Sequence, residues 1–366
     1  MKRCCAVTRE MRFHGGRPPP NVIDFSAPLN PLGVPEFVEE LLRGYSRREV
    51  IERYPDYEYR ELREAIASFF GIDSEKIVPL NGAAEALYLA FLAIKPRSFL
   101  AVEPTFGDHE VLCRAVEVPM FSIPYTLDPV NFRVSLSVEL VLDLVEKLEK
   151  PVLVLLSNPN NPTGCLVPRK ALEKLLEELP DDAYLLLDEA FVDFVEEGSS
   201  LLGYDNPKLV VVRSFTKILS IPGLRIGFAY VASAMLAKRF DSVRQPWNVN
   251  SIAASLMKSI LVEYRSEYLS FIERSRRTVE KLRGIYVVKL RSIGLEIYDS
   301  YAPYILARHP WATHPELQRR LVENRVFVRD CSSFRYLGPC YSRIAIKNLE
   351  YLEILVEAFA KAMGLG

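Results

Sequence analysis

The chain has 366 residues, and its 46 Lys and Arg against 47 Asp and Glu give a formal net charge of −1 at pH 7. A nucleic-acid-binding domain is usually clearly basic, so this balance argues against nucleic acid as a partner. With 49% hydrophobic and 25% charged residues, the composition is that of a soluble globular protein. The length is sufficient for two domains and a ligand cleft.

Targeting and metal-binding signals are not evident in the sequence. No run of about 18 apolar residues occurs, which is the length that a membrane-spanning helix needs. The first residues, MKRCCAVTRE, turn polar before a signal-peptide core can form. The six cysteines are scattered and include no C-x-x-C pair, so neither a disulfide framework nor a zinc site is expected. We therefore predict a cytoplasmic protein without a metal site.

Apolar runs alternate with amphipathic segments through the middle of the chain. Helices are expected at residues 60–71, which end at a glycine, and at residues 168–180, which begin at a proline. The expected strands are residues 76–82, 98–104, 152–156 and 209–212 and the run that ends at Asp188. These runs lack polar alternation, which is typical of strands buried on both faces of a mostly parallel sheet.

The pattern changes after this region. Helical patterns dominate from about residue 250 to residue 282, and shorter mixed segments follow, with the strand candidate SRIAIK and a final helix. We predict an α/β fold with a large domain at residues 45–245, in which helices cover a mostly parallel sheet. Residues 1–44 and 246–366 are expected to form a smaller α+β domain.

Polar segments follow the expected strands, at the point where each strand ends. They read NGAAE, EPTFG, SNPNNPTG, DEAF and RSFTK. Ligands of open α/β sheets bind beyond the carboxyl ends of the strands. The sequence therefore predicts a single site built from these segments.

Lys217, in RSFTK, is the candidate nucleophile. Desolvation at a hydrophobic sheet edge lowers a lysine pKa and makes the amine reactive toward a carbonyl, although a lone loop lysine is more often exposed. The hydroxyls of Ser214 and Thr216 and the guanidinium of Arg225 suit a phosphate group. The N–H groups that follow Gly82 begin an expected helix and suit the same anion, unless the segment is an ordinary strand–helix turn.

Three other residues fit a flat aromatic cofactor. Asp188 ends a buried strand, where a carboxylate is costly unless it is paired. Its partner is either a protonated pyridine nitrogen, as in pyridoxal phosphate (PLP) sites, or a structural group. Asn161 is either a donor to a phenolate oxygen or part of a rigid turn, and Phe106 either stacks on a ring or belongs to the core. Glu189, beside Asp188, is expected to be structural.

Taken together, SNPNNPTG, DEAF and SFTK followed by GLR resemble the fold-type I PLP-dependent enzymes of the class I and II aminotransferase superfamily. The resemblance extends from Asp24 to the last helix. It implies PLP as the cofactor and a homodimer with shared active sites. It implies that Lys217 forms the covalent link to PLP, that Asp188 binds the pyridine nitrogen and that Asn161 binds the phenolate oxygen. Phe106 would stack on the ring, and Tyr54 would reach the cofactor phosphate in the partner subunit. The residues that would hold the phosphate within the same subunit are Ala83, Ala84, Ser214, Thr216 and Arg225.

Two branches of this superfamily are similar to the chain. These are the L-threonine-O-3-phosphate decarboxylases of cobalamin biosynthesis and the histidinol-phosphate aminotransferases. HGG at residues 14–16, DFSAPLNPLG at 24–33, VRDCSSF at 328–334 and DEAF look more like the decarboxylases. Many relatives have a tyrosine at Phe191, and the loss of its hydroxyl leaves more of the contact with the ring oxygen to Asn161.

The resemblance to these branches also implies substrate-binding residues. They are Arg329 for the substrate phosphate, Arg343 for the α-carboxylate, and His14, Asn30 and Lys347 as further contacts. His109, His309 and His314 are expected to be structural. The expected activity is PLP-dependent decarboxylation of L-threonine O-3-phosphate to 1-aminopropan-2-yl phosphate. Histidinol-phosphate aminotransfer, or transfer from another amino acid, is the alternative.

Overall fold

The computed structural model describes residues 15–45 and 48–364. Its helices are α1 (Glu36–Tyr45), α2 (Arg48–Ile51), α3 (Arg60–Phe70), α4 (Glu85–Ile94), α5 (His109–Ala115), α6 (Val138–Lys147), α7 (Arg169–Glu178), α8 (Phe215–Ile218), α9 (Ala234–Val243), α10 (Ser251–Val262), α11 (Arg265–Ser292), α12 (Glu316–Glu323) and α13 (Leu349–Ala362). Within the described ranges, no helix has both the length and the apolar character needed to cross a membrane. The cytoplasmic location stays a prediction.

The strands form one large sheet, one small sheet and two short pairs among the described residues. They are β1 (Ile23–Asp24), β2 (Ile77–Leu80), β3 (Ser98–Glu103), β4 (Met120–Pro124), β5 (Thr126–Asp128), β6 (Arg133–Ser135), β7 (Val152–Ser157), β8 (Ala183–Asp188), β9 (Leu209–Ser214), β10 (Gly227–Val231), β11 (Glu296–Ile297), β12 (Tyr304–Arg308), β13 (Val326–Phe327), β14 (Arg329–Asp330) and β15 (Tyr341–Ala345). The pairs are β1 with β13 and β5 with β6.

The large sheet has seven strands in the order β2-β10-β9-β8-β7-β3-β4. The strands β9, β8, β7, β3 and β4 pair in parallel, whereas β10 is antiparallel to both of its neighbours. The mostly parallel α/β sheet predicted from the sequence is therefore confirmed. The sequence analysis did not predict β10.

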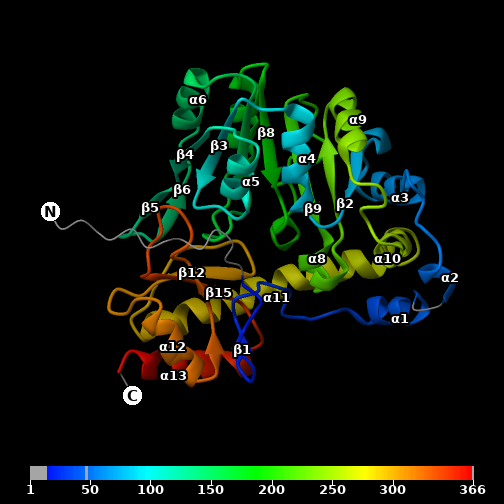
Figure 1. Ribbon diagram of the computed structural model, residues 1–366. Coiled ribbons are helices and arrows are strands. Elements are labelled where there is room, and N and C mark those ends of the chain that lie inside the picture. The colour runs from blue at the N-terminus through cyan, green and yellow to red at the C-terminus, as the bar shows by residue number, and fades with distance from the viewer. Residues whose placement is uncertain (1–14, 46–47, 365–366) are drawn as a thin grey trace.

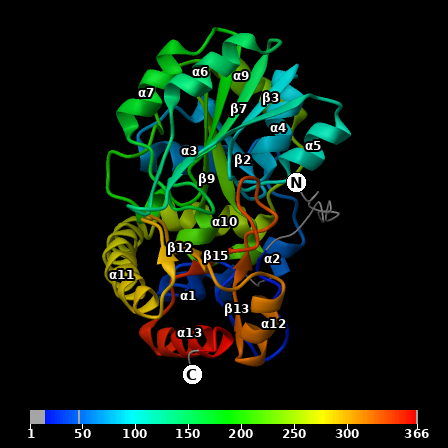
Figure 2. The ribbon, with the colours of Figure 1, turned by 90° about the vertical axis from the view of Figure 1, so that its left-hand side faces the viewer.

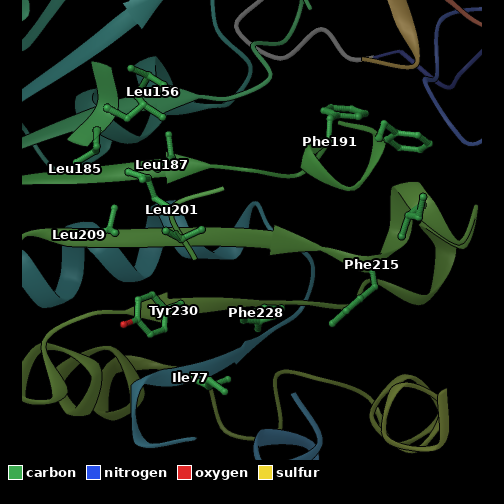
Figure 3. Packing of buried hydrophobic residues seen from close by; sticks show 14 of the residues in the cluster. Ile77, Leu156, Leu185, Leu187, Phe191, Leu201, Leu209, Phe215, Phe228 and Tyr230 are labelled. Atoms are coloured by element: carbon green, nitrogen blue, oxygen red, sulfur yellow. The ribbon is translucent and has the colours of Figure 1, made fainter. Parts of the chain in front are cut away.

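The large sheet is buried on both faces, as its apolar strands predict. Val154 and Leu156 of β7 pack into one hydrophobic core, whereas Leu155, between them, faces the other. Helices α3, α6 and α7 contribute to the first core and α4 and α9 to the second, so helices cover both faces (Figure 2). Figure 3 shows Leu156, Leu187 and Leu209, from three neighbouring strands, in the first of these cores.

A smaller sheet, with the antiparallel order β11-β12-β15-β14, packs with α12 and α13 in a third core. Helix α11 runs along both units (Figure 1). Its Phe271 and Val279 lie in the first core of the large sheet, and its Leu282 and Leu290 lie in the core of the small one. The predicted domain boundaries at residues 44 and 246 stay a prediction. In the packing of the core, α1 and α10 lie with the large sheet.

Candidate active site

The ends of the strands meet at one edge of the large sheet. Ser157, the last residue of β7, pairs with Asp188 at the end of β8. Ser214, which ends β9, pairs with Gly227, and Gly227 pairs with Leu80 at the end of β2. Because β10 is antiparallel, its first residue lies beside the last residues of its neighbours. The segments that follow Leu80, Ser157, Asp188 and Ser214 therefore begin at the same edge, together with the segment that precedes Gly227.

Lys217 lies on α8, the single helical turn that directly follows β9. Burial, together with the positive charges of Arg343 and Arg225, lowers the pKa of its amine to about 8 against the opposing charge of Asp188. The Lys217 Nζ atom lies 5.9 Å from the centre of the Phe191 ring. A larger fraction of this amine is therefore unprotonated near neutral pH than for an ordinary lysine, as a nucleophile requires.

Asp188 presents a buried carboxylate next to this lysine. Burial raises the pKa of Asp188 to about 6, although the Ala190 N–H and the charge of Lys217 oppose the shift. The Ala190 N–H donates to Asp188 Oδ1 at 3.0 Å. A cationic ring N–H would compensate the cost of burying this carboxylate, so Asp188 fits the pyridine nitrogen of PLP.

The turn before α4 and the segment after β9 together offer a phosphate site. Gly82 has a φ of +77°, and a Cβ atom there would lie 2.3 Å from Arg225 Nη2, so the guanidinium packs directly on the turn. Residues 83–84 lead into α4, with Ala84 as its N-cap. The hydroxyls of Ser214 and Thr216 are hydrogen-bonded to each other at 2.8 Å. A helix N-terminus, an arginine and two hydroxyls suit the cofactor phosphate.

Arg343 and Asn161 are joined in the buried part of the site. Arg343 donates from Nη1 to Asn161 Oδ1 and from Nη2 to the Ser26 carbonyl, both at 2.5 Å. Because Oδ1 of Asn161 accepts this bond, the Nδ2 group remains as the donor of the amide. Arg343 Nε is buried without a hydrogen-bond partner in the described part of the chain. A buried donor of this kind is costly, and an oxygen of a bound carboxylate would satisfy it.

Tyr304 is a site residue that the sequence analysis missed. It is fully buried, and its hydroxyl donates to the carbonyl oxygen of Asn160 at 2.8 Å. Its ring meets the Phe191 ring edge-on, with 5.0 Å between the centroids, and Arg343 lies over it at 5.4 Å. Tyr304 thus contacts both the loop of Asn161, through the Asn160 carbonyl, and the ring of Phe191. As one aromatic residue in an apolar strand, it gave no signal beyond core packing.

Two predicted cofactor residues are exposed in this single chain. Phe106 is 37% exposed. Tyr54 is 79% exposed and stacks on Trp247, with 4.5 Å between the ring centroids. Their roles in binding the cofactor stay predictions.

The predicted phosphate ligands of the substrate lie in the smaller unit or outside the described residues. Arg329 is buried, donates to the Asp330 carbonyl at 2.6 Å and to Ser333 Oγ at 2.8 Å, and lies 4.9 Å from the Phe334 ring centre. The Lys347 Nζ atom lies 5.9 Å from the centre of a neighbouring aromatic ring, that of Phe25. His14 falls outside the described residues.

Asn30 is held within the fold by its side-chain amide, and its predicted role in binding the substrate stays a prediction. Its Nδ2 group donates to the Ile218 carbonyl at 2.8 Å and to Ser275 Oγ at 2.7 Å, and its Oδ1 atom accepts the Leu32 N–H at 3.0 Å. Both amide hydrogens are thus used within the chain. The two acceptors are 188 and 245 residues away in sequence, which is why no local pattern indicated them.

The residues predicted to be structural are buried and have partners within the fold. Glu189 is buried, accepts the Leu201 N–H at 2.8 Å and lies 3.7 Å from the Arg213 guanidinium. The buried histidines hydrogen-bond within the fold: His109 to Glu103, and His309 and His314 both to Ser342. Across residues 15–45 and 48–364, no group of three or more His, Cys, Asp and Glu side chains could hold a metal ion.

A lysine with a lowered pKa beside a buried carboxylate, at the carboxyl edge of a mixed seven-stranded sheet, is the arrangement of a fold-type I PLP-dependent enzyme. The chain belongs to the aminotransferase class I and II family, whose model matches residues 20–359. PLP is its cofactor.

Relatives and solved structures of two activities are similar to the chain. A protein of Caldanaerobacter subterraneus subsp. tengcongensis, provisionally named a threonine-phosphate decarboxylase, is 32% identical over 94% of this chain and 92% of its own length. A histidinol-phosphate aminotransferase of Chlorobaculum tepidum is 29% identical over 85% of this chain and 86% of its own.

Both activities also occur among the structural neighbours. The L-threonine-O-3-phosphate decarboxylase of Porphyromonas gingivalis has a TM-score of 0.79 at 26% identity and covers 92% of this chain and 98% of its own. The histidinol-phosphate aminotransferase of Sinorhizobium meliloti, solved in complex with PLP, has a TM-score of 0.79 at 19% identity. The alignment covers 93% of this chain and 90% of that structure, and at this identity it shows the fold alone.

The lowered pKa of Lys217 predicts that the stability of the cofactor-free protein rises with pH. An ordinary lysine has a pKa of 10.5, against about 8 for Lys217 in the folded chain. Between these values the unfolded state binds more protons, so the free energy of unfolding increases with pH. Below the pKa of Lys217 in the folded state, the full free-energy cost of burying the ammonium applies. Above the pKa of this lysine in the unfolded state, the cost disappears.

Urea unfolding of the cofactor-free protein and of its Lys217→Met variant, across this pH window, measures the effect. We expect the variant's advantage to shrink as the pH rises. Two curves that run parallel would contradict the assigned pKa.

Gly82→Ala is expected to weaken cofactor binding. The substitution places a Cβ atom 2.3 Å from Arg225 Nη2 at a positive φ, so the guanidinium must leave the turn. Losing one charge-assisted hydrogen bond to the phosphate raises the Kd for PLP about tenfold or more. Gly284→Ala, in helix α11, is the matched control because its Cβ would meet nothing within 4 Å. Equal Kd values for the two variants in a fluorescence titration would rule the contact out.

Proposed function

We propose that this chain decarboxylates L-threonine O-3-phosphate to 1-aminopropan-2-yl phosphate. The single observation that carries the proposal is the pairing of Arg329 with Arg343 as direct partners on β14 and β15. Directly opposed residues of an antiparallel pair lie on the same face of the sheet. Burial, together with the charge of Arg343, lowers the pKa of Arg329 to about 10 against the opposing effect of Cys331. Two neighbouring guanidinium groups suit a small substrate with both a carboxylate and a phosphate.

The similar proteins support this substrate class. Relatives and structures named as threonine-phosphate decarboxylases match nearly the whole chain. The phenylalanine of DEAF, at Phe191, is part of the resemblance to this branch. The histidinol-phosphate aminotransferases match over a similar span. Arg343 fits both activities, because an aminotransferase must also bind the carboxylate of glutamate.

The residues of the chain divide the work of this reaction. Bound PLP supplies an electron-withdrawing ring that stabilises negative charge at the substrate α-carbon. Asp188 would keep a proton on the ring nitrogen, and Arg225 would hold the cofactor phosphate on the turn of Gly82. Arg343 would orient the carboxylate that leaves as CO₂, and Lys217 would deliver the proton that replaces it.

The direct test is to incubate the PLP-loaded protein with L-threonine O-3-phosphate in the absence of any keto acid. We expect CO₂ and 1-aminopropan-2-yl phosphate to accumulate over many turnovers, as measured by mass spectrometry, and Lys217→Ala to form neither. If no product forms, but histidinol phosphate and 2-oxoglutarate yield glutamate, the chain is an aminotransferase and the decarboxylase proposal is wrong.

Arg329→Ala should raise the KM for L-threonine O-3-phosphate. Loss of a charge-assisted hydrogen bond to a phosphate costs about 1.5–3 kcal/mol, which corresponds to a factor of roughly 10 to 150. The PLP content should not change, because the cofactor phosphate is assigned to Arg225. Steady-state kinetics and the absorbance of bound PLP measure the two effects. An unchanged KM would remove Arg329 from the substrate site.

We also propose a homodimer in which Tyr54 reaches the site of the partner subunit. The exposed aromatic rings of Tyr54, Tyr57 and Trp247 pack together on the surface, as is common in interfaces. Light scattering of the PLP-loaded protein tests the dimer. Mixing inactive Lys217→Ala subunits with Tyr54→Ala subunits should restore activity, since each mixed dimer has one intact site. A mixture no more active than its two components would contradict sharing.

A further inference from the structure

The helical turn that carries Lys217 satisfies only part of its carbonyl groups with nearby donors: the Leu219 N–H donates to the Phe215 carbonyl at 3.2 Å, and the Ile221 N–H donates to the Thr216 carbonyl at 3.1 Å. Helix α8 contains only the four residues Phe215–Ile218. The final carbonyls of any helix lack intrahelical partners and need donors from elsewhere. The Ser220 N–H reaches the carbonyl of Lys217 at 3.4 Å, which is a long bond. The carbonyls of Lys217 and Ile218, at the end of this turn, therefore take donors from another part of the chain.

Asn30 supplies these donors from the segment that follows β1. Its backbone N–H donates to the Lys217 carbonyl at 3.3 Å, and its side-chain Nδ2 donates to the Ile218 carbonyl at 2.8 Å. In return, Ser220 Oγ donates to the Asn30 carbonyl at 3.1 Å. One asparagine thus contacts the three residues 217, 218 and 220, on both sides of the end of α8.

The same side chain also joins α8 to the long helix α11. The second hydrogen of Asn30 Nδ2 goes to Ser275 Oγ at 2.7 Å, and Ser275 in turn donates to the Phe271 carbonyl at 2.6 Å. Asn30 is 4% exposed and Ser275 is fully buried. We propose that Asn30 is a positioning residue for Lys217, because it caps the end of α8 and fixes this turn against α11.

The proposal rests on the proposed role of Lys217 as the nucleophile toward PLP. A buried carbonyl that loses its donor must find water or move. Without the Asn30 amide, the Ile218 carbonyl would draw water to the base of the lysine, and the turn would lose its fixed position. The lysine would then be slower to react, and its amine would titrate closer to the ordinary lysine value. The charged groups that act on it, Asp188, Arg225 and Arg343, all remain.

The test compares the cofactor-free wild type with Asn30→Ala and Asn206→Ala. Asn206 is the matched control, because its amide donates to the Leu176 carbonyl near the end of helix α7 at 3.4 Å, at the opposite end of β9 from Lys217. Each protein is mixed with PLP over a range of pH. The rate of covalent capture is followed by absorbance, and the product is reduced with borohydride and located by peptide mass spectrometry.

We expect Asn30→Ala to capture PLP at Lys217 about tenfold more slowly than the wild type near neutral pH, with the midpoint of the rate profile shifted upward. Asn206→Ala should match the wild type in both measurements. An Asn30→Ala rate and midpoint equal to those of the wild type, or an equal loss in both variants, would overturn the proposal.

A second variant covers a failure of Asn30→Ala to fold. Ser275→Ala removes only the contact with α11 and leaves the Ile218 contact in place. It should slow capture by a smaller factor, and a wild-type rate would overturn the proposal. If the wild type itself gave no adduct at Lys217, the proposed role of the lysine would fail, and this result is distinct from a failure of Asn30.

Discussion

The withdrawal of a lysine and a carboxylate from water at the same sheet edge is the constraint on which this site depends. A tight ion pair would raise the pKa of the amine and lower that of the acid. The opposite shifts occur here, to about 8 for Lys217 and about 6 for Asp188, so burial outweighs their mutual attraction. Both groups are therefore poorly compensated by the protein alone. A ligand that brings its own carbonyl and its own ring nitrogen satisfies each of them.

A buried network of charged residues lies next to Lys217 and Asp188 in the chain and stabilises their positions. Arg213 immediately precedes Ser214 at the end of β9, and its guanidinium contacts Asp193 and lies 3.7 Å from Glu189. Glu189 is the neighbour of Asp188. Breaking one partner of such a buried pair is costly, because the other charge remains in the interior. The contact of Arg213 with Glu189 and Asp193 thus holds the end of β9 next to the segment that follows Asp188.

Much of the large sheet was predictable because a strand buried on both faces is an uninterrupted apolar run. The runs at residues 76–82, 98–104, 152–156 and 209–212 became β2, β3, β7 and β9. The antiparallel β10 was not predictable, since strand direction is a property of the whole sheet. Yet the antiparallel direction of β10 places the segment before Gly227, which includes Arg225, at the same edge of the sheet as Lys217.

The candidate site was predictable where its residues stand in compact motifs, such as DEAF and SFTK. It was not predictable where the function of a side chain depends on distant partners. Asn30 stands in DFSAPLNPLG, whose resemblance implied a substrate contact but gave no sign of the hydrogen-bond partners that the amide has in α8 and α11. Tyr304 lies on β12, far along the chain from the Asn160 carbonyl that it holds. In both cases the tertiary fold, rather than local spacing, determines the contact.

Helix α11 also limits how the chain can be divided. Its 28 residues supply side chains first to the core of the large sheet and then to that of the small one. A protein fragment that ends before the helix would leave the large sheet without Phe271 and Val279, and one that begins after it would lose Leu282 and Leu290. Helix α11 is therefore part of both hydrophobic cores. Neither unit could be exchanged between proteins as a separate domain by dividing the chain at this helix.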